Sequence, residues 1–289
     1  RFKMAQKNNA TKDEHFIPQF YLRQFSPNGI RIYQYNKLEQ KTSKLVPIDS
    51  ICFIKNLYEF RQEDGSIFNQ NLIENTLKLF EGEITEIIKA IKSRVDCVDS
   101  FYSLRFLSDK EQAFLIFFMA IQIIRDPEIL KIMESTAMEH FGNKISKNGA
   151  HNLALMMGLP IYKELNLEEK NILNHILTMF GDKSFQIAVA KKDLILTSDN
   201  PIILRGTNEY NMPKEISFEQ LFVFPLTSRI VLHMKSIELT ESDRINRLVV
   251  MADEFVTRIN QETVMHARKW VYSKSKMTEF QFNKWLLKE

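Results

Sequence analysis

Cysteine, glycine and proline are all scarce in this chain of 289 residues. Two cysteines cannot form a disulfide framework, and so low a number is typical of a cytoplasmic protein, which is the location we expect. Eight glycines and eight prolines leave little room for Gly-rich phosphate loops or for long linkers without structure. With 44% apolar residues, the chain is instead able to bury a substantial core.

Long hydrophobic runs are also missing. The longest lies at residues 113–124 and is interrupted by Gln122, so it is shorter than the roughly 18 apolar residues that a membrane-spanning helix needs. The first residues show no signal-peptide pattern, and we expect no membrane partner. We interpret residues 1–14 as a flexible N-terminus in which the Arg-Phe-Lys before Met4 is a tag remnant.

Three widespread site motifs do not occur in the sequence. The absence of Gly-x-x-x-x-Gly-Lys-[Ser/Thr], Gly-x-Gly-x-x-Gly and Gly-x-Ser-x-Gly argues against a P-loop, a dinucleotide-binding fingerprint and an α/β-hydrolase nucleophile. The chain also has no Cys-x-x-Cys and no His-x-x-x-His pair, which argues against a structural zinc site. A site in this protein must therefore be built from less familiar patterns.

Charge is unevenly distributed along the chain. Residues 1–44 carry nine Lys or Arg against three Asp or Glu, and residues 266–289 carry six against two. Since the total is +3, the segment between these basic ends has a net charge of −7. The two ends could form one face for an anionic partner such as a nucleic acid, or they could simply be solvated surface.

The first part of the chain predicts a small β unit over residues 15–66. Residues 30–35, Ile-Arg-Ile-Tyr-Gln-Tyr, alternate with the period of a strand, and apolar stretches at 45–48 and 57–60 predict two more. A helical region is expected over residues 70–181. An apolar stripe from Ile73 to Ile91 predicts a helix over 71–93.

A second helix over 109–125 is predicted to begin at a capping box, in which Ser108 is followed by Glu111 three residues later. Its residues are apolar on all sides, which is typical of a central helix. Asp126-Pro127 ends it and precedes a third helix over 128–141, and shorter helices are predicted near 149–157 and 167–180.

Residues 184–289 predict a β-rich region with five short strands, a long helix from Glu241 to about Met265, a strand at 270–272 and a terminal helix over 277–288. Strands at both ends with helices between them indicate a single α+β domain over residues 15–289. We expect a mixed or antiparallel sheet, built from N- and C-terminal strands and packed against the central helical region.

The segment at residues 15–25, His-Phe-Ile-Pro-Gln-Phe-Tyr-Leu-Arg-Gln-Phe, is the first candidate site. His15 and Gln19 are polar groups in mostly apolar surroundings, and on a helix they would share a face. Histidine exchanges protons near neutral pH, which makes His15 a candidate general acid or base. Alternatively, both side chains cap backbone groups and fix the N-terminal segment to the core.

The segment Gln122-Ile-Ile-Arg125-Asp-Pro is the second candidate. Gln122 and Arg125 lie on one face at the end of an apolar helix. Arg125 could bind a phosphate or carboxylate in a cleft, or it could form a structural ion pair with Asp126, Glu74 or Glu81.

The third candidate is Thr197-Ser-Asp-Asn-Pro201, directly after a predicted strand. Asp199 could act as a general base or a metal ligand, with Glu81 as a second ligand and Mg²⁺ or Mn²⁺ as the ion, and Asn200 could contact a substrate. The same residues also make a good capped turn. Asn260, near the end of the predicted long helix, could approach the site as a further substrate-binding residue.

These segments, in this order, resemble a family of uncharacterised and mostly bacterial proteins, DUF4238. The resemblance covers most of the chain and includes Asn-Leu-Tyr-Glu at 56–59, Phe-Pro-Leu at 224–226 and Asn260. It implies no established reaction. By carry-over, the signature positions are His15, Pro18, Gln19, Arg125, Ser198, Asp199, Asn200 and Pro201.

Two functions are consistent with these observations. The first is a metal-dependent hydrolase that acts on nucleic acid or a nucleotide in a bacterial defence or toxin setting. In this scheme His15 and Asp199 are catalytic, and Gln19 and Arg125 hold the phosphate. The second is a non-catalytic ligand-binding or sensor module with a basic docking face. The sequence leaves both open.

Overall fold

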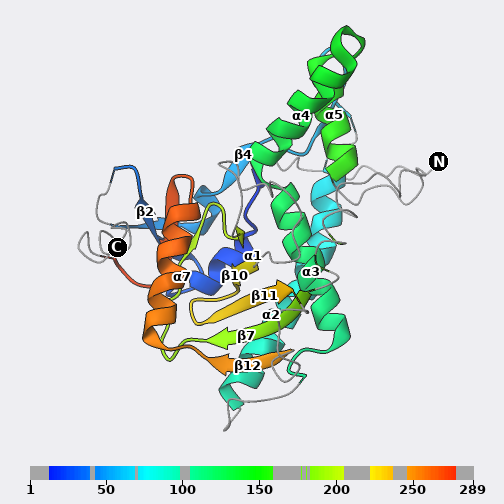
Figure 1. Ribbon diagram of the computed structural model, residues 1–289. Coiled ribbons are helices and arrows are strands. Elements are labelled where there is room, and N and C mark those ends of the chain that lie inside the picture. Colours follow the sequence, from blue (N-terminus) through cyan, green and yellow to red (C-terminus); the bar gives the residue numbers. More distant parts are fainter. Residues whose placement is uncertain are drawn as a thin grey trace, which may run out of the picture.

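A computed structural model describes residues 13–39, 43–68, 71–97, 105–158, 177, 180, 183–204, 222–236 and 246–277. The fold is α+β, as expected, with two main sheets and a group of helices (Figure 1). No helix within these ranges is long and apolar enough to cross a membrane. The expected terminal helix and nearly all of the helix expected over 167–180 lie outside the described residues.

The first sheet joins the two ends of the chain. Its order is β3 (Lys44–Pro47), β2 (Arg31–Asn36), β13 (Trp270–Ser273) and β8 (Thr197–Ser198), and all neighbours are antiparallel. In the β2–β13 pair, residue 36 is opposite residue 270 and residue 33 is opposite residue 273. The expectation that N- and C-terminal strands share a layer is therefore confirmed.

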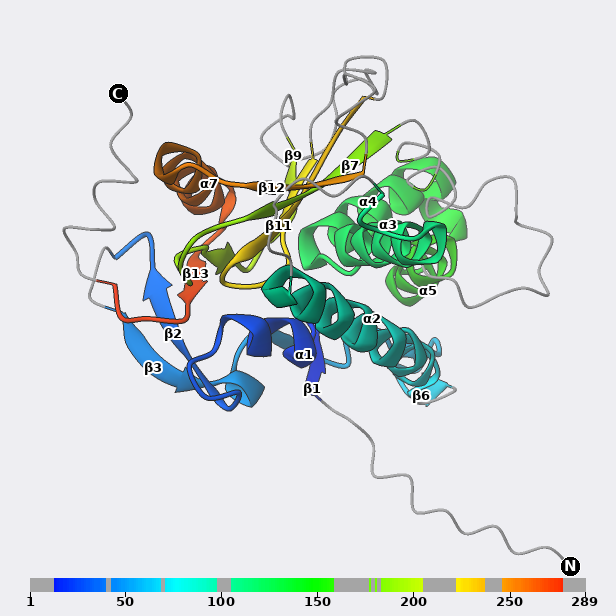
Figure 2. The ribbon, with the colours of Figure 1, turned by 90° about the horizontal axis from the view of Figure 1, so that it is seen from below.

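The second sheet comes entirely from the second half of the chain. Its order is β12 (Arg247–Val250), β7 (Lys183–Val189), β11 (Ile230–Ser236), β10 (Phe222–Pro225) and β9 (Ile203–Leu204), and only the β12–β7 pair is parallel. Helices cover both faces, with α7 (Asp253–His266) on one and α3 (Asp109–Ile124) on the other (Figure 2). Because both faces are covered, β7 and β10 are buried at nearly every position, and β10 is apolar throughout.

Aromatic rings connect the N-terminal segment to this core. The short helix α1 (Gln19–Leu22), which continues into a 3-10 turn at Arg23–Phe25, places Tyr21 in stacked contact with Phe224 of β10, with ring centroids 5.3 Å apart. Phe118 of α3 packs 5.6 Å from Phe224. The Tyr21 hydroxyl donates to the Pro225 carbonyl at 2.7 Å. The N-terminal segment is therefore fixed to the core through Tyr21, which packs against the aromatic rings of β10 and α3.

Four α-helices are described in the helical region of the chain. They are α2 (Leu72–Cys97), α3, α4 (Pro127–Phe141) and α5 (Lys147–Gly158). The expected capping box is present at the start of α3, where Ser108 and Glu111 exchange hydrogen bonds with each other's backbone N–H groups. The α3 helix is largely buried, as its composition predicts.

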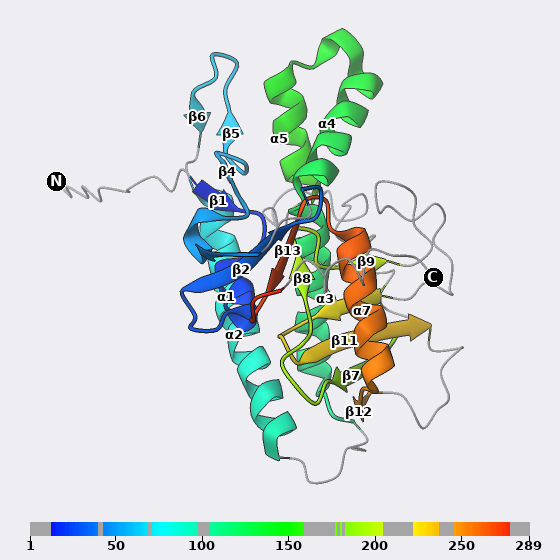
Figure 3. The same ribbon diagram turned by 90° about the vertical axis from the view of Figure 1, so that its left-hand side faces the viewer.

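The α4–α5 hairpin projects from the body, beside the β5 (Phe60–Arg61) and β6 (Ile67–Phe68) hairpin (Figure 3). Asn152 of α5 joins the two, since its side chain accepts from the Arg61 N–H and donates to the Arg61 carbonyl. Nearby, β1 (Asp13–His15) pairs with β4 (Phe53–Lys55). This last pair fixes the backbone around His15.

Three sequence predictions need correction. The helix expected from Glu241 is wrong at its start, because Arg247–Val250 form β12 and α7 begins only at Asp253. Leu248 is buried in this pairing with β7, and the tertiary pairing overrides local helical periodicity. Residues 57–60 form no continuous strand, and the strand expected over 194–197 is limited to Thr197–Ser198.

Candidate functional site

A pocket of about 320 Å³ lies between the N-terminal segment, α2 and the end of α3. It brings together histidine, carboxylate, amide and cationic groups from three separate parts of the chain. Its polar lining consists of His15, Gln19, Arg23, Glu74, Lys78, Glu81, Thr85 and Arg125. The pocket therefore unites four of the residues that the sequence singles out, namely His15, Gln19, Glu81 and Arg125.

The hydrogen bonds of His15 define its tautomer. The Gln19 side-chain oxygen accepts from Arg23 at 2.9 Å, so its nitrogen faces His15 Nε2, 3.3 Å away. Since that nitrogen can only donate, His15 Nε2 is the acceptor and Nδ1 carries the proton. Burial lowers the pKa of His15, so the ring is neutral at pH 7. A neutral imidazole with a lone pair on Nε2 is the protonation state of a general base.

Arg125 forms the buried wall of the pocket. Its side chain is 2% exposed, and Nη1 donates to Glu81 Oε1 at 2.8 Å. Nη2 donates to the His15 carbonyl, and Nε lies 3.4 Å from the Tyr58 hydroxyl. Of the three carboxylates that the sequence allowed as partners, Glu81 is thus the one that pairs with Arg125. The arginine connects α2, α3 and β1 and fixes the backbone of His15.

Glu74 and Glu81 are neighbours on one face of α2, two turns apart. Glu74 forms an ion pair with Lys78 at 3.8 Å, and burial raises its pKa, with the Glu81 charge adding to the rise and Arg125 opposing it. Within the described ranges, no group of three or more His, Cys, Asp or Glu is arranged to hold a metal ion. Glu74 and Glu81 are the only carboxylates among the residues that line this pocket.

Glu14 is a buried acid beside the pocket that the sequence did not reveal. It is 1% exposed, and its Oε2 accepts from the Tyr58 N–H at 2.7 Å, while Oε1 has no hydrogen-bond partner in the part of the chain that is described. Burial raises its pKa to about 7, and repulsion from Glu59 and Glu74 contributes. Glu14 belongs to a three-residue strand, which is too short to show the alternation that would have predicted an inward-facing side chain.

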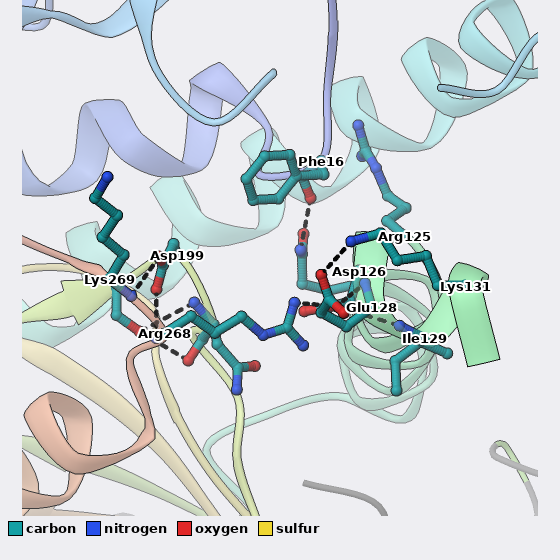
Figure 4. Close-up of polar contacts among 12 residues, drawn as sticks. Phe16, Arg125, Asp126, Glu128, Ile129, Lys131, Asp199, Arg268 and Lys269 are labelled. Atoms are coloured by element: carbon teal, nitrogen blue, oxygen red, sulfur yellow. Dashed lines mark hydrogen bonds and ion pairs between the residues drawn. The ribbon is translucent and has the colours of Figure 1, made fainter. Parts of the chain in front are cut away.

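Asp199 lies elsewhere, as a backbone anchor. Its carboxylate accepts from the N–H groups of Arg268, Lys269 and Trp270 at 2.9, 2.9 and 3.0 Å (Figure 4). It is 6% exposed and is not among the residues that line the His15 pocket. The structure therefore does not assemble the expected Asp199–Glu81 metal pair, because the carboxylate of Asp199 holds the start of β13.

Gln122 and Asn200 meet at a small gap of about 20 Å³ between α3 and the loop after β8. Gln122 donates to the Phe16 carbonyl at 2.8 Å, and Asn200 donates to the His266 carbonyl at 3.2 Å. In the same place Arg268 forms an ion pair with Asp126, which caps α4 (Figure 4). These contacts join the N-terminal segment, α4 and the end of α7.

Asn260 lines neither the His15 pocket nor the gap at Gln122 and Asn200. Its side-chain oxygen accepts from the Leu196 N–H at 3.0 Å, and its nitrogen donates to the Leu194 carbonyl at 2.9 Å. It fixes α7 against the segment that leads into β8, at the wall of a different cleft. Of the seven predicted catalytic and substrate-binding residues, three line the His15 pocket, namely His15, Gln19 and Arg125. The side chains of the other four, Asp199, Gln122, Asn200 and Asn260, connect parts of the backbone.

Comparison with known proteins agrees with the resemblance seen in the sequence. The family model described as "Protein of unknown function (DUF4238)" matches residues 14–277, so the chain belongs to that family. No curated protein and no solved structure matches the chain. The matched range includes every residue of the His15 pocket.

Proposed function

We propose that this protein is a hydrolase that cleaves a phosphate ester in a nucleic acid or nucleotide, and that the His15 pocket is its active site. The observation that carries the proposal is the hydrogen bonding of His15. Its Nδ1 carries the proton, and its Nε2 accepts a hydrogen bond from the Gln19 side chain in the pocket, a contact that the proton of an attacking water would replace. Nε2 can accept the proton of an attacking water as the new P–O bond forms, and can return that proton to the leaving oxygen as the bond between that oxygen and phosphorus breaks.

The charges that line the pocket support a phosphate as the group attacked. Arg23 and Lys78 supply positive charge at the rim, and Gln19 is held between Arg23 and His15 where it can donate to a phosphate oxygen. Arg125 is a positioning residue, because its guanidinium is already committed to Glu81 and to the backbone of His15.

Glu74 and Glu81 would repel a phosphate unless positive charge enters with it. Mg²⁺ is commonly bound by one or two protein carboxylates together with substrate phosphate oxygens and water. The two glutamates are therefore the groups in this pocket that would hold Mg²⁺ or Mn²⁺, which would arrive with the substrate.

The test is hydrolysis of RNA, single- and double-stranded DNA and free nucleotides by the purified protein, with Mg²⁺, with Mn²⁺ and with a chelator. We expect His15→Ala to lower the rate about 10²–10⁴-fold, which is the usual contribution of a general acid or base. The rate of the unaltered protein should rise with pH through a pKa below 6.5, as His15 loses its proton. His140→Ala, at an exposed histidine on α4, is the matched control. Equal rates for His15→Ala and the control, or no hydrolysis of any of these substrates, would disprove the proposal.

A non-catalytic binding module is the second candidate. It is favoured by the positions of Asp199 and Asn200. Their side chains bind backbone groups, so neither residue is among those that line the His15 pocket. A nucleotide that binds in the pocket without turnover, and whose affinity falls in Gln19→Ala, would support this reading.

A further inference from the structure

Two more hollows adjoin the His15 pocket. One of about 250 Å³ lies between Arg23–Phe25, the end of α2 and the turn before β11, and a larger cleft of about 560 Å³ lies between the segment 190–196, α7 and the segment after β13. Arg23 lines both the His15 pocket and the middle hollow. Asp193 and Lys274 line both the middle hollow and the large cleft. The three spaces therefore follow one another, and each shares at least one lining residue with the next.

This path beyond the His15 pocket is strongly basic. Seven Lys or Arg line the middle hollow and the large cleft, against three Asp. Two of the three acids are already paired, Asp193 with Lys274 at 2.8 Å and Asp96 with Arg229 at 3.0 Å. The other five cations, which are exposed and pair with no carboxylate in the described chain, are Arg23, Lys92, Lys191, Lys192 and Lys276.

The charge asymmetry of the sequence explains how this path is built. Arg23 comes from the basic N-terminal end, and Lys274 and Lys276 come from the basic C-terminal end. The β2–β13 pairing brings these two ends together. This pairing is the arrangement that one face for an anionic partner would require, and that interpretation is the one we develop.

The path is long enough for several nucleotides. Lys78 lines the His15 pocket and Lys92 lines the middle hollow, and both belong to α2. Fourteen residues of helix correspond to about 21 Å at 1.5 Å per residue. A stacked nucleic-acid strand advances about 3.4 Å per phosphate, so this length of α2 matches the length of about six phosphates.

We propose that these three neighbouring hollows form a track that binds a single-stranded polynucleotide. The track leads the backbone of the polynucleotide to the His15 pocket. The proposal rests on the proposed function only for the placement of the cleaved phosphate at His15. Among the described residues that line the middle hollow and the large cleft, none is aromatic, and the contacts that these residues offer are to the phosphate backbone. Binding is accordingly insensitive to base sequence and strongly dependent on salt.

Binding to labelled homopolymeric RNA and DNA, measured by fluorescence anisotropy in a chelating buffer over a salt series, tests the track. The variant Lys191→Glu/Lys192→Glu reverses two exposed charges in the cleft, and Lys144→Glu/Lys147→Glu reverses two exposed charges on the α4–α5 hairpin as the matched control. We expect the cleft variant to bind at least about tenfold more weakly, and its slope of log affinity against log salt to be shallower by about 1.4, for two lost contacts. The control should bind like the unaltered protein.

Strand length and turnover separate this proposal from the hydrolase proposal. Affinity should rise from a mononucleotide to strands of about eight nucleotides, and His15→Ala should bind as the unaltered protein does while losing hydrolysis. If the protein binds strands but hydrolyses none of the substrates, the hydrolase proposal is wrong and the track proposal is supported. Equal affinity for mononucleotide and strand, equal weakening in the cleft variant and the control, or tighter binding to anionic lipid vesicles than to either strand would overturn the track.

Discussion

Replacing Glu14 by Gln should stabilise the protein above neutral pH. The side chain is 1% exposed, and one of its oxygens has no hydrogen-bond partner among the described residues. Its pKa rises from 4.5 to about 7, chiefly because burial disfavours the charged form. At about 1.4 kcal/mol per pKa unit, this difference makes the ionised carboxylate cost about 3 kcal/mol of folding free energy. Glutamine keeps an oxygen for the Tyr58 N–H and removes the charge.

The effect has a defined pH window. Below pH 4.5 the carboxyl is protonated in both the folded and the unfolded chain, so it imposes no charge penalty. Between pH 4.5 and 7 the unfolded chain loses the proton while the folded chain keeps it, and the free energy of unfolding falls as pH rises. Above pH 7 the full penalty is present. The variant should therefore match the unaltered protein near pH 4.5 and exceed it by about 3 kcal/mol at pH 8.

Urea unfolding at several values between pH 4.5 and 8 measures this difference, since the midpoint and slope give the free energy of unfolding at each pH. Other buried acids, such as Glu74 and Asp126, titrate in both proteins, so the quantity of interest is the difference between variant and unaltered protein. Glu139→Gln, at an exposed position on α4, is the control. If the difference for Glu14→Gln stays constant across this range, the assignment of Glu14 as a buried titrating acid is refuted.

Three further predictions concern stability, each measured by urea unfolding at pH 7. Asp199→Asn should lower the free energy of unfolding by about 1–3 kcal/mol, because an amide cannot accept from all three backbone N–H groups; no loss would contradict its role as an anchor. Arg125→Met should cost about 3–5 kcal/mol, and adding Glu81→Gln should recover part of the loss, whereas additive losses would argue against a coupled pair. Ser108→Ala should cost about 1 kcal/mol through the lost cap of α3.

Much of the fold could be predicted from the sequence, because local patterns reported local structure. The Ser108–Glu111 capping box and the all-apolar helix that follows fix α3, and the alternation at residues 30–35 fixes β2 to within one residue. The failure at β12 has a physical cause. The residues Arg247–Val250 suit either a helix or a buried strand, and only the open edge of β7 selects the strand.

The candidate site, like the fold, could be predicted from the sequence only in part. The sequence by itself determined that His15, Gln19 and Arg125 are polar groups in apolar segments that need partners, and that the two ends of the chain are basic. Only the tertiary structure decided which partners they find. In the folded protein Arg125 pairs with Glu81, Glu14 is buried beside Tyr58, and Asp199 accepts from three backbone N–H groups. A carboxylate is equally able to bind a metal, a proton or a backbone amide, and packing between segments distant in sequence selects among these.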